Sequence, residues 1–281
     1  MLVMLAMALG LMLVATLVTA PLLVLSGGTL STPALLVVQA VTQLLTFLVP
    51  VLLTTLIYYR GRQREFYRLD FSGPKWLLGL AGVVVMLLLI PVNDWLTVWN
   101  DSWNLGRLGE LMRSLQEQTE AILQQLVAVD TVGGLLANLL VVALIPAVCE
   151  EVFFRAGIQN LLQRWISADG RKPWGVHVAI WLTAILFSLG HGELFAFMPR
   201  LVMGATLGYL YVYGGSLLPN MLAHFVNNAL VVVLYWLVAR GVLDIDPEAP
   251  LQAGLELTVC CTVAAVALFV VTFTKRMKTS R

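Results

Sequence analysis

Charged residues are scarce in this sequence. Lys, Arg, Asp and Glu make up 12% of its 281 residues, whereas a soluble domain carries about 25%. The net charge is only +1, which argues against a nucleic-acid binder that works through bulk positive charge. Hydrophobic residues reach 59%, which excludes a disordered chain and an ordinary soluble globule. The composition predicts a polytopic membrane protein.

Cysteine is also scarce. The three cysteines, Cys149, Cys260 and Cys261, stand in apolar stretches. Their spacing fits neither a zinc site nor a disulfide framework. We expect them to act as small packing residues.

Long apolar stretches, by contrast, are plentiful. A membrane-spanning helix needs about 20 mostly apolar residues. The first stretch is longer than the apolar part of a signal peptide and has no basic residue before it, so we expect it to be retained. The predicted fold class is an all-α membrane protein, a polytopic bundle of about eight transmembrane helices. The expected spans are 2–26, 34–58, 76–98, 132–160, 176–192, 197–213, 217–239 and 251–273.

The chain divides into three parts within one structural domain: residues 1–130, 131–240 and 241–281. The first part ends in a polar insert whose apolar residues recur at helical spacing. This pattern predicts an amphipathic helix that either lies on the outer membrane surface or caps the bundle. Its apolar residues are Leu108, Leu111, Met112, Leu115, Ile122 and Leu126. In the second part, Gly204 and Gly208 have a spacing typical of close helix packing, within the fold or between subunits.

Basic residues gather in alternate connections between the spans. By the positive-inside rule these connections face the cytoplasm. We therefore expect an integral, multi-pass membrane protein with both termini in the cytoplasm, and its short loops suggest a bacterial plasma membrane. The basic residues on this side are Arg60, Arg62, Arg64, Arg68, Lys75, Arg164, Arg171, Lys172, Lys275, Arg276, Lys278 and Arg281. The other side holds Arg107, Arg113, Arg200 and Arg240 among a larger number of carboxylates.

Ionisable residues inside spans are costly and indicate function. The fourth span contains Glu150, Glu151 and Arg155. Glu151 and Arg155 are four residues apart on one helix face and can neutralise each other. Glu150 points about 100° away and has no local partner. Pro146 lies four residues earlier and can kink the span.

Two further polar clusters lie in the fifth and seventh spans. Phe187 and His191 share one helix face, and so do His224 and Asn228, with Asn227 close by. Taken singly, each cluster could simply supply hydrogen bonds between helices. Helix lengths place Glu150 and His191 roughly 20 Å from the cytoplasmic ends and His224 nearer that side, so one cavity could hold them all.

These clusters resemble the E-E-x-x-x-R, F-x-x-x-H and H-x-x-x-N motifs of the CPBP family, which comprises CAAX-protease and bacteriocin-processing intramembrane glutamic peptidases. The resemblance covers about residues 132–235 and makes residues 131–240 a CPBP-like catalytic core. It implies Glu150 as the base that activates water, assisted by His191. His224 and Asn228 would bind the oxyanion, with Phe187 and Asn227 in support. Glu151 and Arg155 would hold the helix and tune Glu150.

The resemblance implies an intramembrane endopeptidase without metal or other cofactor. Its partners would be membrane lipid and a peptide or protein substrate, with a lipidated peptide as one option, cut near the cytoplasmic face. Nucleic acid is not expected, and the oligomeric state stays open. One alternative is a zinc protease with Glu150, His191 and His224 as ligands. The others are a proton-coupled transporter and a membrane scaffold or immunity protein.

Overall fold

The structure is a computed structural model that describes residues 1–25, 30–69, 75–167, 174–249, 251 and 253–277. All regular elements in these ranges are helical. In chain order they are α1 (Leu2–Leu25), α2 (Thr32–Gln43), η1 (Leu44–Leu48), α3 (Val49–Tyr58), α4 (Gln63–Tyr67), α5 (Lys75–Leu88), α6 (Ile90–Asp101), α7 (Gly106–Val127), α8 (Val132–Asn138), η2 (Leu139–Leu144), α9 (Ile145–Glu151), η3 (Val152–Gln159), α10 (Asn160–Ile166), α11 (Trp174–Leu189), η4 (Leu194–Ala196), α12 (Phe197–Gly214), α13 (Leu218–Ala239) and α14 (Leu255–Met277).

This architecture confirms the predicted all-α membrane fold. Within the described ranges, six helices are long and apolar enough to cross a membrane. A seventh span is obtained if α5 and α6, which meet at a bend of 44°, are counted together. The protein is therefore an integral, multi-pass membrane protein. Of the basic residues used to orient it, Arg171, Lys172, Lys278 and Arg281 lie outside the described residues.

With α5 and α6 counted as one span, the structure has seven spans in the described ranges, one fewer than the eight expected. The difference is one stretch. Residues 176–192 were expected to span, but α11 has only 16 residues. The chain leaves the helix at Gly190 and turns at Gly192, which has a φ of +73° that favours glycine. The helix thus ends at Leu189, and His191 follows it in the turn that leads toward α12.

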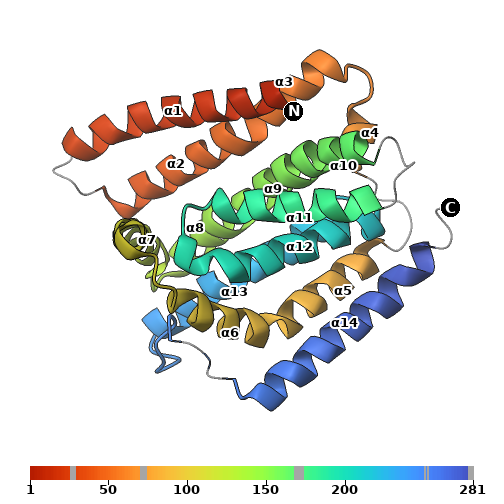
Figure 1. Cartoon of the computed structure of the whole chain (residues 1–281). Coiled ribbons are helices and arrows are strands. Elements are labelled where there is room, and N and C mark those ends of the chain that lie inside the picture. The colour runs from red at the N-terminus through yellow and green to blue at the C-terminus, as the bar shows by residue number, and fades with distance from the viewer. Residues whose placement is uncertain (26–29, 70–74, 168–173, 250, 252, 278–281) are drawn as a thin grey trace.

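The spanning helices run side by side, and α7 crosses them at one end of the bundle (Figure 1). Helices α11 and α12 pack together, and α13 packs against α5. Gly204 and Gly208 make the first of these contacts close, because a Cβ at Gly208 would lie 2.8 Å from Cγ2 of Ile180. The small-residue pair therefore serves packing within the fold.

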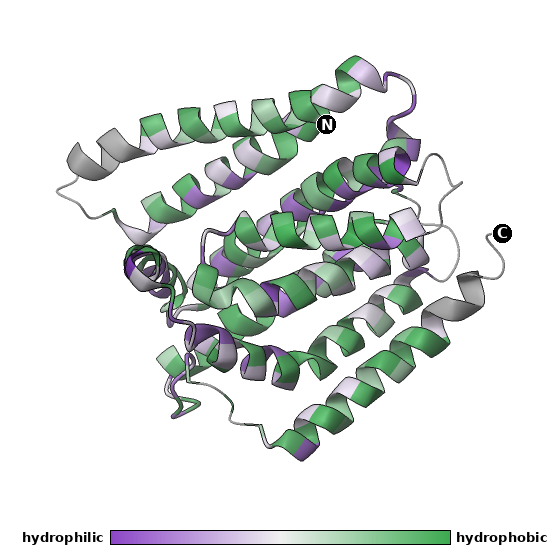
Figure 2. Ribbon diagram, viewed as in Figure 1, coloured by the Kyte–Doolittle hydropathy of each residue, from purple (hydrophilic) through white to green (hydrophobic). Residues whose placement is uncertain are grey.

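Hydrophobic residues cover most of the helices, and hydrophilic residues gather on α7 and near helix ends (Figure 2). Large apolar side chains on the outer helices are exposed, as expected for surfaces that face lipid. The centre of the bundle instead buries charged groups, with Glu151 and Arg155 both at 0% exposure. This distribution directs attention to the polar interior.

Helix α7 is the amphipathic helix predicted from the polar insert. It contacts α2, α8, η4 and α13. Arg113 pairs with Asp101 at 2.8 Å, and Gln125 donates to the Leu30 carbonyl at 2.8 Å. Helix α7 thus covers one end of the bundle, while four of its six predicted apolar residues, Leu108, Leu111, Leu115 and Ile122, are exposed.

Candidate active site

Glu150 lies midway along the helical segment that runs from α8 to α10. The backbone is irregular on both sides, with a wide π-helical turn before α9 and another after it. Pro146, near the start of α9, has no backbone N–H and cannot complete a regular helical hydrogen bond. Such π-helical turns are rare and often occur at functional sites. The Glu150 residue is 5% exposed, so its carboxyl group is buried within the helix bundle.

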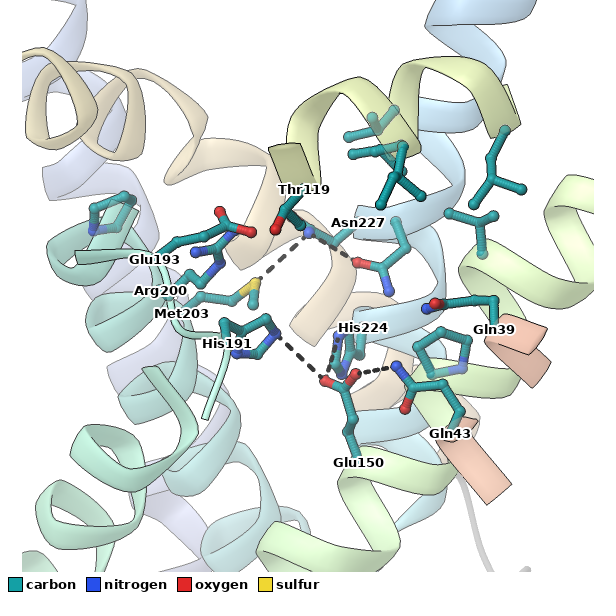
Figure 3. A pocket seen from close by; sticks show the side chains of 18 of the residues that line it. Gln39, Gln43, Thr119, Glu150, His191, Glu193, Arg200, Met203, His224 and Asn227 are labelled. Atoms are coloured by element: carbon teal, nitrogen blue, oxygen red, sulfur yellow. Dashed lines mark hydrogen bonds and ion pairs between the residues drawn. The ribbon is translucent and has the colours of Figure 1, made fainter. Parts of the chain in front are cut away.

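The two carboxyl oxygens of Glu150 have different surroundings (Figure 3). Oε1 accepts a hydrogen bond of 3.3 Å from Nε2 of Gln43 on α2. Oε2 lies 3.8 Å from Nε2 of His191 and 3.9 Å from Nε2 of His224. It is buried and has no hydrogen-bond partner among the described residues. Both separations exceed a direct hydrogen bond, so Oε2 keeps its acceptor capacity.

Both imidazole rings are oriented by their other nitrogen. Nδ1 of His191 lies 2.7 Å from the Phe187 carbonyl oxygen, which can only accept. Nδ1 of His224 lies 3.1 Å from Oε1 of Glu151. Since the acceptors fix the proton on Nδ1 in each ring, both residues present Nε2 to Glu150. A second group that orients a functional histidine is common at catalytic sites.

Glu151 connects its own helical segment to α13. Its Oε2 accepts from Nε of Arg155 at 3.0 Å and from Nδ2 of Asn220 at 3.2 Å. Its Oε1 contacts His224. The Glu151 and Arg155 side chains are fully buried, where charges interact more strongly than in water. This carboxylate therefore neutralises Arg155 and fixes His224, whereas Glu150 stays available.

Phe187 packs against the rings of both His191 and His224. Its ring centroid lies 4.8 Å from that of His191 and 6.0 Å from that of His224. The Arg155 guanidinium carbon is 5.3 Å from the same ring. Phe187 is fully buried, so it holds the rings in place from one side.

A cavity of about 440 Å³, called the Glu150 cavity below, opens around these groups. Glu150, His191, His224, Asn227 and Asn228 all line it. Nδ2 of Asn227 lies 3.4 Å from Oδ1 of Asn228. The structure thus brings the four predicted catalytic residues to one cavity, and places Asn227 beside Asn228 without distinguishing their roles.

Several lining residues were missed by the sequence interpretation. Gln39 and Gln43 stand one turn apart on α2, within a stretch taken only as a span. Asn93 of α6 also lines the cavity, as do the ion-paired residues Glu193 and Arg200. The detectable signal was a pair of amides, four residues apart, in an apolar stretch. Their contact with Glu150 is tertiary and had no local pattern.

The zinc alternative gains no support from the side-chain geometry. In the part of the chain that the structure describes, no group of three or more His, Cys, Asp and Glu side chains is arranged to hold a metal ion. Glu150, His191 and His224 are among these described residues. Cys149 is buried beside Glu150, and Cys260 and Cys261 lie on α14.

The helices and the buried acid–imidazole cluster define a membrane-embedded candidate hydrolase site. Comparison with protein families gives the class: residues 132–230 match the model of the Rce1-like type II CAAX prenyl endopeptidase family. The chain carries a domain of this CPBP family over these residues. No curated protein and no solved structure matches the chain. All eight predicted site residues fall within the matched segment, and the family implies peptidase activity.

Proposed function

We propose that the protein is an intramembrane endopeptidase of glutamic type, which cleaves a peptide bond in a membrane-associated substrate. The main support is the position of Glu150 Oε2. This buried oxygen has no hydrogen-bond partner among the described residues, faces two imidazole nitrogens at 3.8 and 3.9 Å, and lines a cavity. A carboxylate with this freedom suits a general base that holds a water molecule.

In the proposed reaction, Glu150 takes a proton from water while the water oxygen attacks the scissile carbonyl carbon. A tetrahedral intermediate forms, and its C–N bond then breaks as the amine nitrogen receives the proton. His191 assists by holding the water through Nε2, because its Nδ1 is already engaged with Phe187. Proton transfer by a placed base typically contributes about 10²–10⁴ in rate.

The negative charge that develops on the carbonyl oxygen requires donors in the same cavity. We assign this role to His224 and Asn228, which both line it. With Nδ1 directed at Glu151, His224 donates from Nε2 when the ring carries both protons. The Asn228 amide supplies an N–H donor in any protonation state. Fixed donors of this kind give large rate effects.

Glu151 and Arg155 act in this scheme as positioning residues. Glu151 holds His224 and Asn220, and Arg155 neutralises its charge. The substrate is a peptide or protein at the membrane. A prenylated CAAX-type peptide is the first class to test because of the matched family, and a bacteriocin-like peptide is the second.

The experiment compares the wild type with Glu150→Gln in detergent, using a peptide library that includes prenylated CAAX peptides. We expect the substitution to lower cleavage by at least about 10²-fold, since the amide cannot take a proton from water. Glu65→Gln is the matched control, because Glu65 is exposed in α4 and pairs only with Arg62 among the described residues. Size-exclusion profiles and thermal unfolding show that the proteins remain folded.

Equal product from wild type and Glu150→Gln would refute the assignment of the base. Loss of wild-type activity on chelation, restored by zinc, would favour the metalloprotease instead. If the wild type cuts no peptide while Glu150→Gln blocks proton-coupled uptake, the transporter reading would replace the peptidase. Mass spectrometry of peptides retained by Glu150→Gln in native membranes would then identify the substrate.

A further inference from the structure

A second cavity adjoins the Glu150 cavity and leads toward the α7 end of the bundle. Its volume is about 580 Å³. Thr119, Leu123, Glu193 and Arg200 line both cavities, so the two are neighbours. We call this second cavity the vestibule. Its walls come from α6, α7, the turn before α12, the end of α13 and the segment after it.

The vestibule and the Glu150 cavity lie toward one membrane side. Helix α7, the start of α12 and the end of α13 meet at this end of the bundle (Figure 1). At the opposite end, α3 leads into α4 and α10 and α14 terminate. That opposite end carries basic residues, among them Arg60, Arg62, Arg68 and Arg164. By the positive-inside rule it faces the cytoplasm, and the vestibule faces away from it.

The vestibule has an excess of negative charge. Two of its carboxylates are ion-paired, Asp101 with Arg113 at 2.8 Å and Glu193 with Arg200. The other two accept hydrogen bonds from neutral groups. Glu120 accepts from Gln116 at 2.9 Å. Glu248 accepts from Gln124 at 2.5 Å and from Tyr235 at 2.7 Å. The charges of Glu120 and Glu248 therefore remain uncompensated by these contacts.

The Glu150 carboxylate, in the adjoining cavity, is the group that a substrate entering through the vestibule would reach. Glu150 is 5% exposed, and its Oε2, without a hydrogen-bond partner among the described residues, lines the adjoining cavity. Two acidic side chains thus line the vestibule, and one unpartnered carboxylate oxygen lines the cavity that adjoins it. Carboxylates outnumber the one arginine, Arg200, in the walls of the two cavities, and such an excess of one sign of charge attracts ligands of the opposite sign.

We propose that the site takes its substrate from the extracytoplasmic side, as a positively charged peptide segment that passes the vestibule under α7 before its scissile bond reaches Glu150. This inference rests on the proposed function and specifies its substrate. It differs from the sequence-based expectation of cleavage near the cytoplasmic face. The difference arises because α7 lines the Glu150 cavity at the end of the bundle opposite the basic residues.

The first test concerns the side of the membrane and needs no activity. Glu120→Cys and Arg62→Cys are made separately, and sealed right-side-out vesicles are treated with a membrane-impermeant maleimide. We expect Glu120→Cys to be labelled in sealed vesicles, and Arg62→Cys only after permeabilisation. The unmodified protein gives the background of the native cysteines. The reverse labelling pattern would overturn the proposed side of access.

The second test concerns the charge of the peptide and uses binding rather than turnover. A fluorescent peptide with three lysines, and its Lys→Gln counterpart, are titrated against Glu150→Gln protein in detergent. Adding Glu120→Gln and Glu248→Gln should raise the Kd of the lysine peptide about tenfold at low ionic strength and less at high salt. The neutral peptide should bind both proteins equally.

The matched control is the pair Glu110→Gln and Glu117→Gln. Both glutamates are exposed on α7 and line neither cavity, so an unchanged Kd is expected. A lysine-peptide Kd that ignores the vestibule substitutions would overturn the inference, even if the wild type hydrolyses peptides. Charge-dependent binding together with no hydrolysis by the wild type would leave the inference standing and refute the peptidase proposal.

Discussion

The matched segment, residues 132–230, and the preceding residues 1–127 contribute differently to the Glu150 cavity. All charged or titratable side chains that line it come from the matched segment: Glu150, His191, Glu193, Arg200 and His224. The earlier residues contribute only amide, hydroxyl and apolar groups: Gln39, Gln43, Asn93, Thr119, Ile122, Leu123 and Leu126. The proton-transfer groups and the covering wall thus have separate origins in the chain.

Because of this division, the family match supports an expectation about the reaction type but not about the substrate. Similarity over residues 132–230 concerns the groups that perform chemistry. The shape of the cavity and its cover under α7 depend on residues outside the match. Substrate preference is decided by such surrounding contacts. The reaction type is therefore the stronger expectation from the match, and the substrate has to be argued from this chain's own N-terminal helices.

Among the substitutions that compare the matched segment with the N-terminal helices, we expect the largest loss of stability inside the matched segment. Glu151→Gln leaves the fully buried Arg155 without its carboxylate partner. Breaking one side of a buried ion pair typically costs about 3–5 kcal/mol. We expect a markedly lower thermal unfolding temperature in detergent, measured by intrinsic fluorescence. Glu117→Gln on the exposed face of α7 should leave it unchanged.

A double variant at Glu151 and Arg155 distinguishes the effect of this ion pair on stability from its effect on cleavage. Glu151→Gln combined with Arg155→Met removes both charges, so a large part of the lost stability should return. Activity should stay low, because His224 still lacks the carboxylate that receives its Nδ1 proton. If the double variant regained wild-type cleavage, Glu151 would have no positioning role.

A somewhat smaller effect is expected at the proposed oxyanion donor. Asn228→Ala should lower kcat by about 10²–10³, the usual loss for one such donor, with the protein still folded. Asn227→Ala, one residue earlier on α13 and lining the same cavity, is the matched comparison. A loss below about threefold for Asn228→Ala would mean that Asn227, or no asparagine, fills the role.

Local sequence patterns predicted much of the matched segment. The four-residue spacings fix the Glu151–Arg155 ion pair and the contact of Phe187 with His191, both seen in the structure. Apolar stretches predicted the helices, but they did not reveal that α11 has only 16 residues. The reason is that an apolar sequence is equally compatible with lipid and with a protein interior.

The N-terminal contribution could not be predicted in the same way. The periodicity of α7 suits both a membrane surface and a bundle cap, and its contacts with α2, α8, η4 and α13 are tertiary. Likewise, Gln43 on α2 reaches Glu150 from another helix, over a sequence separation of 107 residues. Contacts between distant helices leave no spacing pattern in a single sequence. The roles assigned to the eight site residues remain predictions until activity is measured.

The smallest change in kcat is expected for a substitution in the N-terminal helices. It tests whether these helices do more than enclose the Glu150 cavity. Gln43→Ala removes the 3.3 Å hydrogen bond to Glu150 Oε1 and, with it, the group that orients the carboxylate. Hydrogen bonds to charged groups are worth about 1.5–3 kcal/mol, so a fall in kcat of about tenfold is expected, measured under saturating substrate. Gln39→Ala is the matched control, since Gln39 lines the same cavity one turn away without a hydrogen bond to Glu150. Equal losses for the two variants would show that α2 acts on the site only through the cavity wall, and the catalytic groups would then be confined to the matched segment.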